Sequence, residues 1–232
     1  MYGQGADLPK RYGIKDRDVA AAWVIERVFD GTLRSGDRLD RQEIADAVGI
    51  SRVPVQEMLA QLERDGIVRT EYHRGAYLER FDPEVIRETY DLFGMVSGRA
   101  SESAARVMTR ELSDELDDIV ARMRDSDDDE LNDLSWEFRR LVNTAASGPR
   151  MRAMLSTFRT FMPTAFVLLL DRKRNRARIL QHYRTECAAL ARRDAAGARR
   201  AAEVRSAEEG EMLITELVRR GVFESDGRSE LA

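Results

Sequence analysis

The 232-residue sequence has one cysteine, two histidines and no long apolar run, so it has few of the features that disulfide-stabilised proteins, metal enzymes and membrane proteins depend on. Apolar runs such as Ala165–Leu170 are far short of the roughly 20 residues that cross a bilayer. Residues 1–10 contain no apolar core of the kind that signal peptides carry. One cysteine excludes an internal disulfide framework, and two histidines are too few for a multi-histidine metal site within one chain. We therefore expect a cytoplasmic protein with no membrane span.

The composition is otherwise that of a globular protein. Apolar residues make up 43% of the chain and charged residues 34%, which is enough apolar material for a packed core and excludes wholesale disorder. The 38 basic and 42 acidic side chains give a net charge of −4. The chain therefore lacks an overall basic coat, and any contact with nucleic acid has to come from a local basic surface.

The first third of the chain has the pattern of a small domain with three helices and a two-stranded wing. Apolar residues recur at helical spacing from Val19 to Phe29, and Gly49 separates two further short helices. Ser51 is placed to cap the third helix, and Pro54 lies in its first turn, where a missing N–H costs nothing. The predicted helices and strands cover residues 19–29, 41–48, 51–64, 67–70 and 76–79.

The remainder of the chain is almost wholly helical in pattern. It opens with Asp82-Pro83, an N-cap residue followed by a first-turn proline. We expect a mainly α protein, with a winged helix-turn-helix domain over residues 16–80 and an antiparallel all-α helical bundle over residues 81–223. The polar ends, residues 1–15 and 224–232, are expected to be flexible. The predicted bundle helices are residues 83–108, 113–125, 129–146, 149–170, 173–193 and 195–220.

Helix, turn and helix in this order are typical of DNA-reading proteins. The second helix of such a motif lies in the major groove with its N-terminal residues at base edges. Arginine pairs with guanine and glutamine with adenine through two hydrogen bonds each. A basic wing tip beside a glycine approaches a narrow groove or a phosphate closely. The predicted contact set on the two motif helices and the wing is Arg41, Gln42, Ser51, Arg52, Val53, Gln56, His73, Arg74 and Gly75.

Several local motifs match a known family. The first domain contains Leu33-x-x-Gly36-x-x-Leu39, Glu43-Ile44-Ala45, Val48-Gly49-Ile50-Ser51-Arg52-x-Pro54-Val55, Leu59-x-x-Leu62 and Asp65-Gly66-Ile67-Val68. It resembles the winged-helix domain of GntR-type transcriptional regulators. The helical remainder is similar to the effector domain of the FadR (FCD) branch, through Asp82-Pro83 and the segment from Phe138 to Pro149. Gln42 and Gln56 stand where family members usually have arginine, which implies a different operator sequence.

The resemblance also bears on metal binding. Many proteins of this branch hold a metal ion through one aspartate and three histidines. The helix registers place Ser135, Arg139, Tyr183 and Arg205 at these positions, with His182 beside Tyr183. Arginine has no lone pair to donate, so this set cannot ligate a transition metal. We expect no metal and no other cofactor.

Two arginines facing the interior of a bundle indicate an anion. A carboxylate or phosphate matches the forked guanidinium group, and the hydroxyl groups of Ser135 and Tyr183 would add donors. Because relatives without metal bind acyl ligands, the resemblance makes a fatty acid or acyl-CoA plausible. In the alternative interpretation, the nearby methionine and phenylalanine residues are plain core, and the arginines pair with acids such as Glu186 or Glu203. The predicted effector-binding set is Ser135, Arg139, Phe158, Met162, His182, Tyr183 and Arg205.

The sequence contains no nucleophile–base pair, paired carboxylates or phosphate loop that would indicate an enzyme. It predicts a regulator that binds double-stranded operator DNA as a homodimer, because two-fold operators are read by two-fold dimers. A small anionic effector in the helical domain is expected to modulate that binding. The alternative is a helical ligand-binding or scaffold protein whose winged helix contacts other proteins. The pattern leaves open whether the ligand releases or promotes DNA binding.

Overall fold

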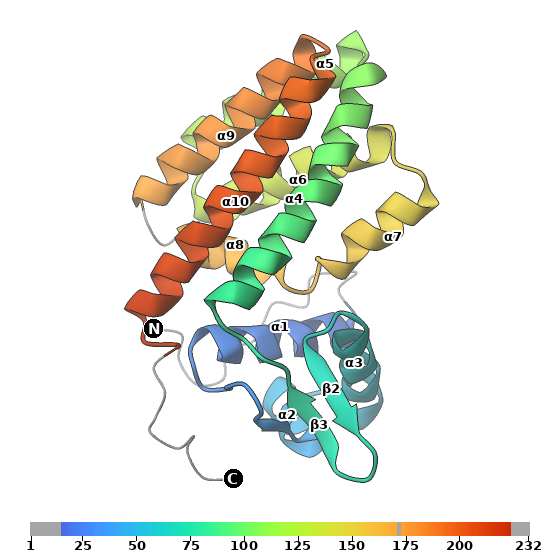
Figure 1. The fold of residues 1–232 in the computed structure, drawn as a ribbon, viewed down its shortest axis with the longest axis vertical. Coiled ribbons are helices and arrows are strands. Elements are labelled where there is room, and N and C mark those ends of the chain that lie inside the picture. The colour runs from blue at the N-terminus through green and yellow to red at the C-terminus, as the bar shows by residue number, and fades with distance from the viewer. Residues whose placement is uncertain (1–14, 171–172, 224–232) are drawn as a thin grey trace.

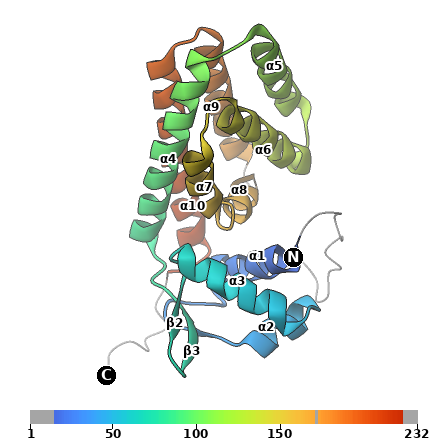
Figure 2. The same cartoon turned by 90° about the vertical axis from the view of Figure 1, so that its right-hand side faces the viewer.

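The computed structural model describes residues 15–170 and 173–223, and it places a small domain at one end of an elongated helical domain (Figures 1 and 2). The expectation of flexible ends concerns residues that, apart from Lys15, lie outside the described part of the chain. The β3 strand ends at Leu78 and the first helix of the larger domain begins at Pro83. The two domains therefore join through a connection of only a few residues.

The small domain is a winged helix with three helices and a three-stranded sheet. Its helices are α1 (Asp16–Phe29), α2 (Arg41–Val48) and α3 (Arg52–Arg64). Its strands are β1 (Arg38–Leu39), β2 (Val68–Glu71) and β3 (Gly75–Leu78), antiparallel in the order β1-β3-β2. The two expected wing strands are β2 and β3, but the sheet has a third strand, β1, that was not predicted. A strand of two residues shows no alternation that a sequence pattern could reveal, and pairing with Ala76 and Tyr77 is what makes it a strand.

Local hydrogen bonds set the ends of the two motif helices. The Asp40 carboxylate accepts from the backbone N–H groups of Gln42 and Glu43 and so caps α2. Gly49 then ends α2 in the left-handed region, at φ 73°. Ser51 occupies the N-cap position of α3, but its side chain makes no capping hydrogen bond. The expected role of Ser51 as a cap was therefore wrong, and its hydroxyl remains exposed at the head of α3.

The helical domain consists of antiparallel helices whose first and last members lie side by side (Figure 1). These two, α4 and α10, approach closely because small residues face the partner helix. A Cβ atom added at Gly94 would lie 3.1 Å from Ser206 Cβ, and one added at Gly210 would lie 3.0 Å from Tyr90 Cβ. The helices of this domain are α4 (Pro83–Arg106), α5 (Arg110–Asp125), α6 (Asp128–Ala145), α7 (Pro149–Thr157), α8 (Met162–Leu170), α9 (Lys173–Ala191) and α10 (Ala195–Arg219).

The predicted continuous helix over residues 149–170 was wrong, because the chain breaks into α7 and α8 with a bend of 57°. Pro163 in the first turn of α8 has no N–H to donate, and its ring would clash with the carbonyl group of Arg159 in a continuous helix. Over the described ranges, no single helix is long and apolar enough to cross a bilayer. Only α7 and α8 together reach that length and composition.

The break between α7 and α8 places aromatic rings at the junction of the two domains. The ring of Phe161 lies 5.2 Å from that of Phe29 in α1, edge to face, and 6.3 Å from that of Phe81 in the connection. Thr160 Oγ1 donates a hydrogen bond of 3.1 Å to Asp65 Oδ2, just after α3. The start of α8 is thus in direct contact with the winged-helix domain.

Candidate nucleic-acid interface and buried pocket

An open groove of about 650 Å³ runs between the wing and the first turns of α2 and α3. Arg38, Arg41 and Arg52 contribute three cations to it, against the carboxylates of Asp40 and Glu57. Hydrogen bonds from the backbone N–H groups of Glu43 and Gln42 lower the pKa of Asp40. Of the nine residues predicted to contact DNA, the groove is lined by Arg41, Gln42, Arg52, Val53, Gln56 and Gly75.

The three remaining predicted residues are exposed at the edges of this groove. Ser51 lies at the head of α3, and His73 and Arg74 lie at the tip of the wing. His73 adopts φ 59°, a left-handed conformation that turns the chain at the tip. Arg74 Nη1 lies 3.6 Å from Glu71 Oε2, with 78% of its side chain exposed. An ion pair this open leaves the guanidinium group available to another partner.

Two groove and wing residues were missed from the sequence. Arg38 packs on Gly75, because a Cβ atom at Gly75 would lie only 3.0 Å from Arg38 Nε. Tyr72 is 88% exposed beside His73, with ring centroids 3.9 Å apart. Arg38 was hidden because its strand was not predicted. Tyr72 could have been predicted from the sequence, because an aromatic residue next to a basic turn is a stacking surface for nucleic acid.

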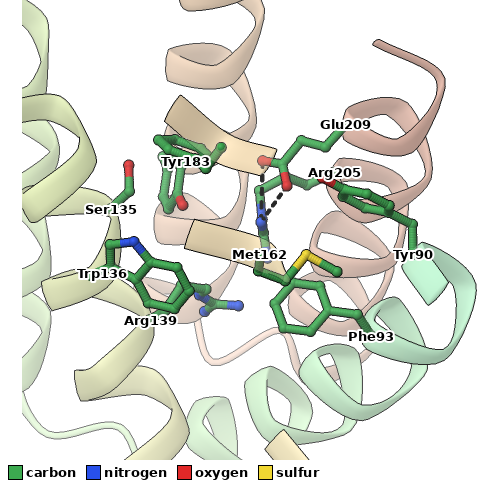
Figure 3. A pocket seen from close by; sticks show the side chains of 10 residues that line it. Tyr90, Phe93, Ser135, Trp136, Arg139, Met162, Tyr183, Arg205 and Glu209 are labelled. Atoms are coloured by element: carbon green, nitrogen blue, oxygen red, sulfur yellow. Dashed lines mark hydrogen bonds and ion pairs between the residues drawn. The ribbon is translucent and has the colours of Figure 1, made fainter. Parts of the chain in front are cut away.

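A second, buried cavity lies inside the helical domain (Figure 3). Its volume is about 20 Å³, which is room for about one water molecule. Five of the seven residues of the predicted effector-binding set line it: Ser135, Arg139, Met162, Tyr183 and Arg205. The sequence interpretation missed the other lining residues, which are Tyr90, Phe93, Trp136, Phe166 and Glu209.

Two members of the predicted effector-binding set lie elsewhere, so the structure corrects their placement. Phe158 follows the last residue of α7, and its ring packs against Phe93 at 5.3 Å, behind the cavity wall. The prediction of one continuous helix over residues 149–170 placed Phe158 on the same face as Met162, but the two residues lie on opposite sides of the break between α7 and α8. His182 Nε2 lies 3.1 Å from Glu208 Oε2 on α10. Neighbouring residues on a helix point about 100° apart, so Tyr183 faces the cavity and His182 does not.

Arg139 and Arg205 are both buried, with 4% and 2% of their surfaces exposed. Arg139 Nη2 donates to Glu186 Oε1 at 2.7 Å, and Glu186 Oε1 also accepts from Ser101 Oγ at 2.6 Å. Arg205 Nη1 donates to Glu209 Oε2 at 3.0 Å, and its Nε lies 3.7 Å from Glu186 Oε2. The alternative interpretation, in which the arginines pair with acids, is thus confirmed for Glu186. Glu203 pairs instead with exposed Arg199.

Burial and neighbouring charges act in opposite directions on these arginines. Burial lowers the pKa of Arg139 in spite of the nearby Glu186 carboxylate. For Arg205 the carboxylates of Glu209 and Glu186 and the Tyr183 hydroxyl outweigh burial, and they raise its pKa above the ordinary value. Because arginine is not deprotonated in proteins, both groups carry a positive charge at neutral pH.

Several polar atoms of this cluster have no hydrogen-bond partner within the described part of the chain, although Arg205 Nε and Glu186 Oε2 form a long ion pair. They are Nε and Nη1 of Arg139, Nε and Nη2 of Arg205, and Oε2 of Glu186, all buried. Figure 3 shows the Arg139 guanidinium group between the rings of Trp136 and Phe93, and the Arg205 guanidinium group beside Met162 and below the Glu209 carboxylate. A buried N–H group without an acceptor is costly, and this cavity contains four nitrogen atoms in that state.

Comparison with known proteins shows two matching family models and related regulators. Residues 17–78 match the bacterial regulatory proteins of the gntR family, and residues 88–204 match the FCD domain. The chain is 41% identical over 217 residues to the HTH-type transcriptional regulator Rv0043c of Mycobacterium tuberculosis, covering 93% of this chain and 88% of that one.

Two solved structures share the fold. McbR/YncC of E. coli superposes with a TM-score of 0.61 at 18% identity, over 89% of this chain and 98% of its own. A GntR family member from Pseudomonas syringae pv. tomato gives 0.52 at 18% identity, over 88% and 86%.

Proposed function

Because the chain belongs to the GntR family of bacterial regulatory proteins, we propose that a small organic anion bound in its helical domain modulates its binding to operator DNA. The protein is a DNA-binding transcriptional regulator with an FCD domain, and its family is one of regulators and not of enzymes. The finer proposals concern which residues touch DNA, what binds in the helical domain and how many chains act together.

For the DNA contacts we propose the groove and the wing tip. Arg52 and Val53 in the first turn of α3 would face base edges, and Arg74 on the wing would contact a phosphate or the minor groove. Arg52→Ala should change the preference among sequences. Arg74→Ala should weaken binding to all duplexes alike and reduce the slope of log affinity against log salt by about 1. Gel-shift titrations at several salt concentrations measure both effects, and an unchanged preference in Arg52→Ala would contradict the assignment.

The observation that supports an effector is the set of unpartnered guanidinium nitrogens in the buried cavity. The two cations there are already paired with two carboxylates, but four guanidinium nitrogens still have no acceptor within hydrogen-bond distance, and the unsatisfied Glu186 Oε2 lies 3.7 Å from Arg205 Nε. A carboxylate ligand supplies two acceptor oxygens in the geometry of the guanidinium fork. The hydroxyl group of Tyr183 and the ring of Trp136 would border the same ligand.

The size and lining of the cavity narrow the class of ligand. A volume of about 20 Å³ has no room for an acyl chain, so we propose a small carboxylate, whose entry would widen the cavity, in place of a fatty acid or acyl-CoA. The residues at this position do not fit a transition metal either, because two of them are arginines. Within the described ranges, no three His, Cys, Asp or Glu side chains are grouped closely enough to hold one.

Thermal unfolding in the presence of short carboxylates tests the proposed ligand class. Sodium salts of one- to three-carbon monocarboxylic acids should include at least one that raises Tm in proportion to the logarithm of its concentration. Arg139→Lys keeps the charge but loses the fork, so it should abolish that rise. Arg178→Lys on the outside of α9 is the matched control, since Arg178 is 62% exposed. If no carboxylate stabilises the protein, or if Arg139→Lys responds like wild type, the ligand proposal is wrong.

The position of α8 provides a route from the cavity to the DNA-binding domain. Met162 and Phe166 of α8 line the cavity, and Phe161, directly before α8, packs on Phe29 of α1. A ligand that shifts α8 would therefore change the placement of the winged helix. Its effect on DNA affinity is limited by the difference in its own affinity for the two placements.

We propose that the protein acts as a homodimer and that a second copy covers the outer face of α4 and α10. Leu92, Met95 and Val204 are 45%, 51% and 50% exposed on these two helices. Arg87 and Glu211 pair across the helices at 2.6 Å and present both charges to a two-fold-related copy. Met95→Asp should give a monomer in light scattering, whereas Val107→Asp, at an equally exposed position beyond α4, should not. Dimers in both variants would contradict this interface.

A further inference from the structure

Four exposed polar side chains join α2 to α3 by crossed hydrogen bonds. Arg41 Nη1 of α2 donates to Gln56 Oε1 of α3 at 2.5 Å. In the opposite sense, Arg52 Nε of α3 donates to Gln42 Oε1 of α2. All four side chains are exposed, and the α2–α3 contact is already made by buried apolar residues such as Ile44. The crossed bonds therefore do not belong to the packing of the domain.

The orientation of the Gln42 amide is determined by a third residue. Gln42 Nε2 donates to Asp46 Oδ1 at 2.6 Å, one turn further along α2. A carboxylate only accepts hydrogen bonds, so the amide nitrogen has to face Asp46 and the amide oxygen has to face Arg52. Pairing with adenine would require the same amide to offer both its oxygen and its nitrogen to one base edge. Gln42 is already engaged at both ends and is not free to do so.

Resting on the DNA contacts proposed for α3, we propose that Gln42 and Gln56 are positioning residues for Arg52 and Arg41. They hold the two guanidinium groups in the groove and do not read bases themselves. This replaces the simpler expectation that a glutamine in the first turns of α2 and α3 selects adenine. Arg52 is held through Nε, and neither of its Nη groups has a hydrogen-bond partner among the described residues, so both can donate to two acceptors on one base edge.

Such positioning acts on sequence preference more than on overall affinity. Phosphate contacts supply most of the sequence-independent affinity, whereas base contacts decide between sequences. An arginine whose rotamer is not fixed can turn to acceptors on a base other than the preferred one, or on a phosphate, and so loses little affinity for other sequences. An arginine fixed at Nε presents its fork in one direction only, so wrong bases are penalised.

The experiment begins with the full-length wild-type protein and a pool of random-sequence duplexes. The duplex that wild type enriches is then measured against all of its single-base changes at one salt concentration. Gln42→Met keeps the length of the side chain and removes the amide. It should lower discrimination at the base read by Arg52 by at least about fivefold. Its binding to an unrelated duplex should stay within about twofold of wild type.

Two further variants show whether Gln42 acts through Arg52. Gln42→Met combined with Arg52→Ala should discriminate no worse than Arg52→Ala alone, because the two residues act as a unit. In the double variant Gln42→Glu with Asp46→Asn, the new asparagine at position 46 can donate a hydrogen bond to the new carboxylate at position 42. That carboxylate still offers an oxygen atom to Arg52. This double variant should recover at least half of the lost discrimination. Gln56→Met with Arg41→Ala tests the second pair in the same way.

The chain contains a matched control outside the groove. Gln61 of α3 donates to Asp65 at 2.8 Å and accepts from Arg64 at 2.7 Å, so it has the same Asp–Gln–Arg chain of bonds. Gln61→Met should leave discrimination unchanged. Circular dichroism melts of every variant show whether the domain remains folded.

Each result separates the two proposals. If Gln42→Met discriminates like Gln61→Met while Arg52→Ala does not, the positioning role is wrong and the DNA contact of Arg52 stands. If Gln42→Met loses selection for a base that Arg52→Ala still selects, Gln42 reads that base itself and the positioning role is again wrong. If wild type enriches no sequence, or if Arg52→Ala keeps the full preference, the DNA contacts proposed for α3 fail.

Discussion

Replacing Glu186 by alanine tests how the buried charges of the helical domain are held. The Glu186 side chain has no exposed surface, and its Oε1 accepts from Arg139 Nη2 at 2.7 Å and from Ser101 Oγ at 2.6 Å. Removing one partner of a buried ion pair costs about 3–5 kcal/mol, because the other charge is left uncompensated. For a chain of this size, the loss corresponds to a fall in Tm of about 6–20 °C.

The same variant should be rescued by an added carboxylate. The deleted side chain leaves space next to Arg139 and Arg205, where a formate or acetate ion would find the unpartnered guanidinium nitrogens. At 100 mM salt, a dissociation constant of about 10 mM would return about 1.4 kcal/mol, or about 3–6 °C in Tm. Wild type should gain less, because its own carboxylate already occupies the position.

Circular dichroism melts of full-length protein measure both effects, with sodium chloride at equal ionic strength as the reference. Glu208→Ala is the matched control, because Glu208 pairs with Arg178 and His182 at the outside of the domain. Its loss should be about 0–1 kcal/mol, with no rescue. If Glu186→Ala unfolds at all temperatures, Glu186→Gln keeps one acceptor and should lie between it and wild type. If the Tm of Glu186→Ala lies within about 2 °C of the Tm of Glu208→Ala, the Glu186 carboxylate does not stabilise the buried arginines as described.

Three further changes have definite expected outcomes. Phe161→Ala removes the ring at the domain junction, so urea unfolding should show a loss of about 3–5 kcal/mol, and a loss below 1 would contradict the packing. Gly210→Ala should cost about 1–3 kcal/mol because its new Cβ would lie 3.0 Å from Tyr90, whereas Gly148→Ala, with no neighbour within 4 Å, should cost less than about 1. Burial raises the pKa of the Cys187 thiol, so iodoacetamide at pH 8 should label it only in urea, and rapid labelling of folded protein would contradict this. Because the unfolded thiol ionises first as pH rises, the free energy of unfolding should also fall above the ordinary thiol pKa.

Much of the winged helix was predictable because its signals are local. Asp40 before α2 and Gly49 after it each act within four residues, through a capping bond and a left-handed turn. The third strand was not predictable, because β1 becomes a strand only through pairing with Ala76 and Tyr77, which lie 37 and 39 positions after their partners in the chain. Arg38 was missed for that reason, although its charge was plain in the sequence.

The buried pocket was predictable only in part. Ser135 and Arg139 lie four residues apart and share a helix face, so one register placed both at the cavity. Glu209 had a signal that was overlooked, since it follows Arg205 by four residues and pairs with it. Phe158 was misplaced because it lies at the C-terminal end of α7 while Met162 begins α8, and the bend of 57° between them means that the two residues do not share one helix face.

The sequence by itself determined the order of helices, the wing and the charge at each position of the two motif helices, because caps, glycines and apolar periodicity act over a few residues. It also excluded a multi-histidine metal site through its two histidines. Only the tertiary structure decided which hydrogen-bond and ion-pair partners the charged and polar side chains have. Glu186 meets Arg139 and Arg205 from different helices, and Gln42 meets Arg52 across a turn, because distance in space and not spacing in the chain sets a hydrogen bond.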